Sequence, residues 1–181
     1  MNERLPQTTW SRRIESALAR LEGAASWIWV ALLAVIVVNV VARYAFGEGR
    51  IEFEELQWHL YSVGFLIGIV AGVGRDAHVR VDGLRERFST RTQAWIELYG
   101  LLLLLFPFVA LVLFFSVPFV ASAFETGEVS VSAGGLPYRW AIKGALVGGF
   151  ALLGLAGFAR LLRVCALLFG APTPLPTGEE S

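Results

Sequence analysis

The sequence has few of the residues that build disulfides, haem sites or metal sites. Its 181 residues include one cysteine and two histidines. The single thiol, Cys165, cannot form an internal disulfide and suits a small apolar position in a helix. His59 and His78 are expected at opposite ends of the molecule, which argues against a bis-histidine haem and against a zinc site. We therefore expect no cofactor and no metal ion.

An excess of charge of either sign is also absent, and so are the signatures of catalysis. The formal net charge is zero, so no general basic field exists that would attract nucleic acid. No glycine-rich phosphate loop of the Walker type occurs, so the chain is not expected to hydrolyse ATP. No serine or cysteine has a nearby base at a plausible depth. These absences predict that the chain is not an enzyme.

Apolar residues are what the sequence has in abundance, at 56 % of the chain. They form four long stretches, near residues 24–46, 53–74, 94–124 and 139–169. Each can supply the roughly 20 residues that a helix needs to cross a bilayer. Runs such as Trp27–Val38 are apolar all round, whereas a helix of a soluble domain would show a polar face. The pattern predicts an all-α membrane protein, a bundle of four transmembrane helices with short interfacial helices.

Basic residues predict how this bundle is oriented. Arginines gather before the first stretch, between the second and third, and at the end of the fourth. The two remaining connections are acidic and hold only Arg43, Arg50, Arg139 and Lys143 on their side. Lysine and arginine collect on the cytoplasmic side of membrane proteins. Both termini are therefore predicted to be cytoplasmic.

The chain divides into a terminal segment, a membrane domain and a tail. Residues 1–23 are predicted to be cytoplasmic or interfacial; within them the pattern leaves a short surface helix and a frayed terminus open. Residues 24–169 form the transmembrane domain, and residues 170–181 are expected to be disordered. Thr90 and Gln93 have the spacing of a capping box ahead of the third stretch, and Pro107 predicts a kink within it.

Small and polar residues inside the stretches are candidates for helix packing. Glycines four residues apart share one helix face and let another helix approach closely, within the bundle or against a partner. Asn39 interrupts the first stretch and is expected to hydrogen-bond across to a neighbouring helix. The candidate packing residues are Gly64, Gly68, Gly72, Gly144, Gly148 and Asn39.

Ionisable residues open the second stretch and allow two interpretations. Glu54, Glu55 and His59 could form a proton or ion relay, because charged groups inside membranes are costly and tend to be functional. They could instead form a polar collar at the outer interface, where Trp58 and Tyr61 also belong. The glutamates come just before the apolar run, which favours the collar. His59 lies deeper and is the better candidate for a specific hydrogen bond.

Several short motifs are similar to those of one transporter family. Asn39, Arg43 and Tyr44 end the first stretch, and Glu54-Glu55-Leu56 leads the second. His78-Val79-Arg80-Val81-Asp82 follows a glycine-rich run. Gly127-Glu128-Val129-Ser130 and Gly134-Gly135-Leu136-Pro137 come before the last stretch. Over most of residues 24–165 the chain resembles the small permease subunit of tripartite ATP-independent periplasmic (TRAP) transporters, the DctQ-like family. The Gly-Gly-Leu-Pro stretch looks like the branch for 2-oxo acids, mannitol or chloroaromatic compounds.

The resemblance implies partners and a role in the bacterial inner membrane. A periplasmic binding protein captures an organic acid or related solute, and a large subunit of about a dozen helices carries it by alternating access with an ion gradient, usually sodium. The small subunit is then a scaffold that braces the large one. Glu54, Glu55 and Glu128 would face the binding protein. His78, Arg80, Arg85 and Arg87 would meet the inner lipid headgroups.

Two further functions remain open from the residues alone. An independent small channel or carrier would need several inward-facing polar residues at mid-depth, and only Asn39 and His59 are available. A scaffold for another membrane complex would use the same apolar faces. A membrane enzyme would need a catalytic cluster, which the sequence lacks.

Overall fold

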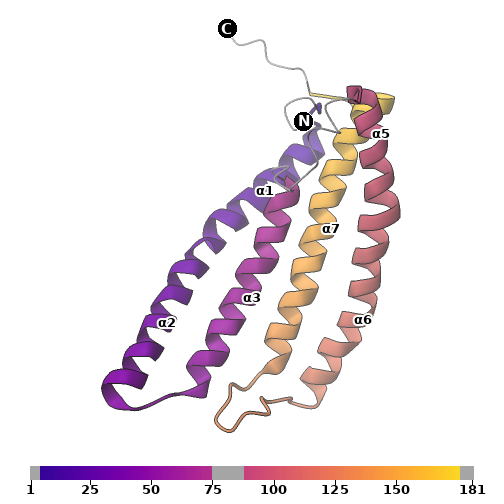
Figure 1. The fold of residues 1–181 in the computed structure, drawn as a ribbon. Helices are drawn as coiled ribbons and strands as arrows, with labels where there is room; N and C mark the ends of the chain where they lie inside the picture. The colour runs from indigo at the N-terminus through magenta and orange to yellow at the C-terminus, as the bar shows by residue number, and fades with distance from the viewer. Residues whose placement is uncertain (1–4, 75–87, 176–181) are drawn as a thin grey trace.

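The computed structural model describes residues 5–74 and 88–175 of the chain. These residues form helices and loops, with no strand among them. Four helical spans are long and apolar enough to cross a membrane, which confirms the predicted all-α membrane architecture (Figure 1). The helices are α1 (Thr9–Ala25), α2 (Trp27–Phe46), α3 (Ile51–Gly74), α5 (Thr90–Gly100), the π-helical turn η2 (Leu101–Leu105), α6 (Phe106–Glu125) and α7 (Arg139–Phe169).

The first span is made of two helices, α1 and α2, which follow one another along one inclined line (Figure 1). The segment for which the sequence left a helix and a frayed terminus open thus contains a helix. It begins with a capping box in which the Ser11 amide donates to Thr8 Oγ1 at 3.1 Å and the Thr8 amide donates to Ser11 Oγ at 3.0 Å. Both capping side chains are buried, so this start is also packed against the rest of the chain.

The third span changes from α-helix to π-helix just before a proline. Residues Leu101–Leu105 form the π-helical turn η2, and Pro107 lies in the first turn of α6. Proline has no amide hydrogen, and its ring clashes with the carbonyl four residues earlier in a regular α-helix. A π-helical turn widens the helix locally, so the irregularity expected at Pro107 occurs in the residues immediately before it.

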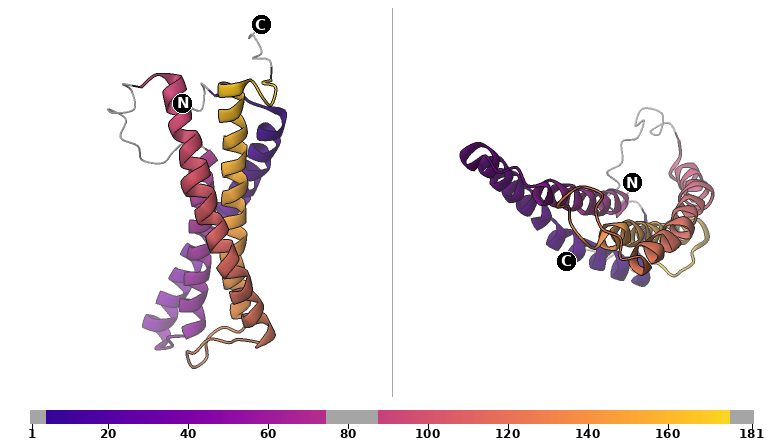
Figure 2. Two further views of the ribbon diagram at one scale, coloured as in Figure 1. Left: turned by 90° about the vertical axis from the view of Figure 1, so that its right-hand side faces the viewer. Right: turned by 90° about the horizontal axis from the view of Figure 1, so that it is seen from below.

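The four spans lie side by side in a curved row, in the order α2, α3, α7, α6 (Figures 1 and 2). α7 packs against α3 on one side and α6 on the other, and α1 and α5 contact it at one end. Half of the most apolar stretch of α7 is buried, compared with 6 % in the first span. α7 is therefore the central helix, and α2 and α6 are the edges.

Two ends of the molecule can be distinguished. The start of α1 and the end of α7 lie at one end, here named the terminal end (Figure 1). There the Leu175 amide donates to the Gln7 carbonyl at 2.7 Å. The opposite end, named the loop end, holds the α2–α3 and α6–α7 connections. An even number of crossings places both ends of the described chain on one side of a membrane, and that this side is the cytoplasm stays a prediction.

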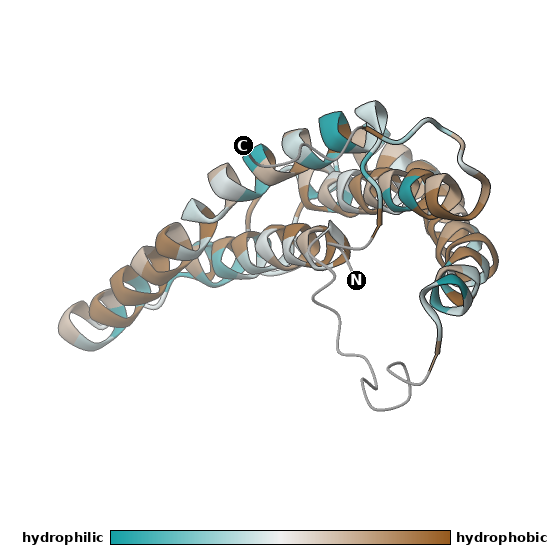
Figure 3. Ribbon diagram, turned by 90° about the horizontal axis from the view of Figure 1, so that it is seen from above, coloured by the Kyte–Doolittle hydropathy of each residue, from teal (hydrophilic) through white to brown (hydrophobic). Residues whose placement is uncertain are grey.

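Large apolar side chains cover the outward faces of the edge helices. The ribbon of α2 is hydrophobic along most of its length (Figure 3). On α2 the exposed side chains include Val30, Leu33, Val37 and Val41, and on α6 they include Phe108, Leu111, Phe114 and Phe115. Surfaces of this extent face lipid or another protein and not water.

Candidate functional site

The loop between α6 and α7 is fastened to the start of α3 by the carboxylate of Glu55. One carboxylate oxygen accepts a hydrogen bond from the Ser130 hydroxyl, and the other accepts one from the Leu136 amide at 2.7 Å. The Ser130 amide in turn donates to the Leu136 carbonyl at 3.2 Å. Glu55 therefore closes the loop on itself and ties it to α3. Three motifs that the sequence analysis quoted separately meet at this one side chain.

Glycine is required at position 135, where the loop passes close to Ser130 and Glu55. A Cβ atom built on Gly135 would lie 2.4 Å from Ser130 Cβ and 2.9 Å from Glu55 Oε1. Tyr138, directly before α7, has a φ of 63°, in the left-handed region that costs most residues about 1–2 kcal/mol. The hydrogen bonds to Glu55 hold this crowded and strained loop in one shape.

Two ion pairs flank the Glu55 cluster. Arg43 at the end of α2 pairs with Glu54 at the start of α3. Lys143 in α7 pairs with Glu128 in the loop, and its ammonium lies 3.7 Å from the centroid of the Phe119 ring. All three carboxylates that the sequence suggested for docking thus bind groups of their own chain. The docking role stays a prediction, and their visible role is to shape the loop end.

His59 lies one helical turn after Glu55. Its Nδ1 atom is hydrogen-bonded to the Glu55 carbonyl of the same helix. The hydrogen bond expected of His59 is therefore local, and it does not extend to another helix through that atom. Among residues 5–74 and 88–175 no group of three or more histidine, cysteine, aspartate or glutamate side chains could hold a metal ion.

Replacing Glu55 by leucine is expected to release the α6–α7 loop. Leucine cannot accept the two hydrogen bonds, and a bond to a carboxylate contributes about 1.5–3 kcal/mol. The Leu136 amide should then exchange its hydrogen at least about tenfold faster. Hydrogen exchange read by mass spectrometry on the purified chain measures this. Glu54→Gln is the matched control, because its half-exposed ion pair is worth less than about 1 kcal/mol. Equal exchange in both variants and the wild type would show that Glu55 does not hold the loop in place.

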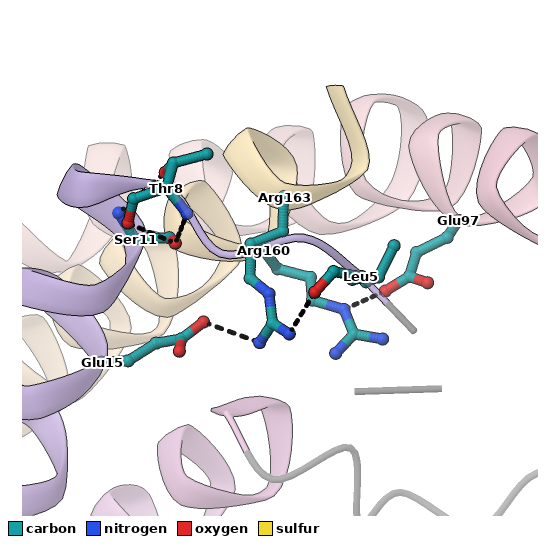
Figure 4. A network of polar contacts seen from close by, with 7 residues as sticks. All are labelled: Leu5, Thr8, Ser11, Glu15, Glu97, Arg160 and Arg163. Atoms are coloured by element: carbon teal, nitrogen blue, oxygen red, sulfur yellow. Dashed lines mark hydrogen bonds and ion pairs between the residues drawn. The ribbon is translucent and has the colours of Figure 1, made fainter. Parts of the chain in front are cut away.

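A second polar cluster lies at the terminal end, and the sequence analysis missed it (Figure 4). Arg160 of α7 pairs with Glu97 of α5, and their side chains are only 5 % and 12 % exposed. Arg163, one turn later, donates to Glu15 of α1 at 3.1 Å and to the Leu5 carbonyl at 2.9 Å. Two arginines three residues apart within an apolar stretch share a helix face, and this was the available signal.

This cluster joins three helices that are far apart in the sequence. Through Glu97 it ties α5 to α7, and through Glu15 and Leu5 it ties the chain's first described residues to the same helix (Figure 4). Val164, which lies beside Arg163, is fully buried in an apolar cluster with Leu5 and Ala94. In the sequence, Arg160 and Arg163 indicate only how the bundle is oriented in the membrane. Their buried ion pairs show that they also hold helices together.

The candidate glycines divide into two groups. A Cβ on Gly64 would lie 3.0 Å from the Trp29 ring of α2, so this glycine lets α2 and α3 approach each other. Gly68, Gly144 and Gly148 have nothing within 4 Å of such a Cβ atom, and Gly72 is half-buried. Gly149 is instead a glycine at which α3 and α7 approach closely, because a Cβ there would lie 2.9 Å from Leu66 Cβ.

The remaining candidates are Asn39 and the four residues that were predicted to contact lipid headgroups. Asn39 is buried in α2, and its side chain forms no hydrogen bond with any described residue. His78, Arg80, Arg85 and Arg87 lie outside the described residues, so their contact with lipid headgroups stays a prediction.

Comparison with known proteins adds one finding to this geometry. A protein-family model described as the DctQ component of tripartite ATP-independent periplasmic transporters matches residues 32–167. The match covers well over half of the chain and includes the Glu55 cluster and both buried arginines. No curated protein matches the chain.

Proposed function

We propose that this chain, which belongs to the DctQ family of TRAP transporter components, is the fixed scaffold of its transporter. Family membership makes it a small membrane subunit of such a transporter and not an enzyme. In the proposal it lies in the bacterial inner membrane with both termini in the cytoplasm. There it braces a large permease subunit of about a dozen helices, whose transport domain moves by alternating access.

Family membership carries this proposal, and the row of helices supports it. A row buries only one layer of helix contacts and leaves broad apolar faces on α2 and α6. Such faces can pack against the helices of a large subunit over their whole length. The ion pairs at both ends tie the helices together, which suits a part that stays rigid while its partner moves.

The loop end is proposed to face the periplasm and to meet the substrate-binding protein. Glu55 holds the α6–α7 loop in one shape, and the loop exposes Val129 and Val131 beside its hydrogen-bonded core. The coupling ion of this proposal, sodium, and its solute class, organic acids, come from the family relationship. The chain itself is proposed to bind neither of them.

Reconstitution tests the scaffold function directly. Tagged chain purified from its native membrane in mild detergent should bring along a stoichiometric large membrane protein, identified by mass spectrometry. In liposomes the two subunits with the binding protein should take up solute, whereas the small chain alone should not. Uptake by the small chain alone would reject the scaffold and favour an independent carrier. Recovery of the chain without a large membrane protein would also count against the proposal.

A further inference from the structure

Asn39 is a buried amide that has no hydrogen-bond partner among residues 5–74 and 88–175. Its side chain lies in α2, with 6 % of the residue exposed, and its Oδ1 atom is fully enclosed without a donor. Burying an amide without a partner is unfavourable, more so where the surroundings are apolar. Most buried polar atoms in folded proteins are paired. The amide therefore needs a donor from outside the described chain.

A pocket of about 320 Å³ opens beside this amide, between α2 and α3 near the loop end. Its volume equals that of roughly ten liquid water molecules, so it can admit a side chain from another molecule. Besides Asn39 its polar and aromatic lining consists of Arg43 and Tyr44 of α2 and of Glu54, Gln57 and Trp58 of α3. The pocket thus offers two amides, one ion pair and two aromatic side chains.

The charges that line the pocket favour a neutral group as its occupant. Arg43 is already paired with Glu54, so the pocket has no surplus positive charge for the phosphate of a lipid. A charged side chain would likewise enter without compensation. A hydroxyl or a carboxamide can both donate to Asn39 and accept from Gln57.

The depth of Asn39 in the membrane indicates that this neutral group belongs to a protein helix and not to a lipid. Asn39 lies seven residues before the end of α2 at Phe46, about 10 Å along the helix axis at 1.5 Å per residue. At that distance below the helix end, lipids present ester oxygens and acyl chains, which are not donors. A membrane helix can present a hydroxyl or amide at any depth. The neighbouring Val37, Val40 and Val41 are exposed and give such a helix an apolar surface to pack on.

We infer that this pocket receives a serine, threonine, asparagine or glutamine side chain from a helix of the large permease subunit, which donates a hydrogen bond to Asn39 Oδ1 once the amide turns from its enclosed position towards the pocket. The inference rests on the proposed function and names the place on the scaffold where the large subunit engages. α2 would then be the edge of the row that meets the partner.

Asn39→Leu separates this role from a purely structural one. Leucine has a similar size and removes the buried amide, so the purified chain alone should melt at the same temperature or higher. Its assembly with the co-expressed large subunit should weaken about five- to tenfold, measured by detergent copurification at graded concentrations. Ser116→Ala is the control, because this buried hydroxyl of α6 bonds the Leu113 carbonyl of its own helix at 3.5 Å. It should leave assembly unchanged.

Each outcome decides the inference. Unchanged assembly of Asn39→Leu, or a lower melting temperature of the isolated variant, would overturn it. If wild-type chain and large subunit do not assemble at all, the scaffold function itself fails. Trp58, exposed at the pocket, can be replaced by the photoreactive p-benzoylphenylalanine. A covalent adduct with the large subunit supports the inference, and an adduct with phospholipid alone overturns it by assigning the pocket to lipid.

Discussion

Replacing Gly149 by leucine should force α3 and α7 apart and destabilise the chain by about 1–3 kcal/mol. Even a Cβ atom at this position would lie 2.9 Å from Leu66 Cβ. Leu66 Cβ is attached directly to the backbone, so a rotamer change cannot relieve the overlap and the helices must move. Because α7 is the central helix, the displacement affects the contacts of the whole row. The melting temperature of the purified chain in detergent should fall by several degrees.

The adjacent glycine provides a matched control for this experiment. Gly148 is exposed, and a Cβ there would have nothing within 4 Å. Gly148→Leu adds the same atoms to the same helix one residue earlier, so the isolated chain should melt within about a degree of the wild type. An equal loss of stability in both variants would show that leucine disturbs α7 itself and not its packing on α3.

Replacing Arg160 by methionine should destabilise the chain by about 3–5 kcal/mol, because it leaves a buried carboxylate without its counter-ion. Glu97 is 12 % exposed, and its second oxygen has no partner in the part of the chain that the structure describes. Thermal unfolding of the purified chain measures the loss.

A second substitution tests whether the carboxylate is the cause. Adding Glu97→Leu to Arg160→Met removes the isolated charge and places two apolar side chains together, a change that is often neutral or stabilising. The double variant should therefore be more stable than Arg160→Met alone. If the second substitution makes the protein less stable, the two side chains do not act as a pair. The surrounding apolar contacts of α5 with α7 would then be the main source of stability.

The spans could be predicted from the sequence because hydrophobic length is a local property. The stretch predicted near residues 94–124 became Thr90–Glu125, and the stretch predicted near 139–169 became α7 with the same bounds. The predicted N-terminal capping residue of α5 was wrong by one position. The Thr92 amide donates to Ser89 Oγ at 3.2 Å, so Ser89 and not Thr90 caps the helix. Neighbouring hydroxyl residues compete for this role, and their spacing alone does not decide between them.

The partners of side chains could not be predicted, since they depend on how the helices are ordered in space. The sequence alone does not show whether Gly148 or Gly149 packs against another helix. The rotation of α7 about its own axis directs Gly149 towards Leu66. The sequence likewise shows Arg160 and Glu97 as charges in two apolar spans, and their pairing follows from α5 lying against α7. Asn39 was recognised as unusual because a polar residue within an apolar run is visible without any structure.

The central position of α7 has a consequence for how the chain is made. α7 is the last of the described helices to leave the ribosome, yet it supplies the surfaces on which α3 and α6 pack. Until it arrives, the earlier spans can insert into the membrane and α2 can pack on α3, but the row cannot be completed, and Glu15 and Glu97 lack their arginines. Folding of the membrane domain therefore has to wait until α7 has been synthesised. A truncation anywhere before α7 should give an inserted but unfolded product, the kind of protein that membrane proteases remove.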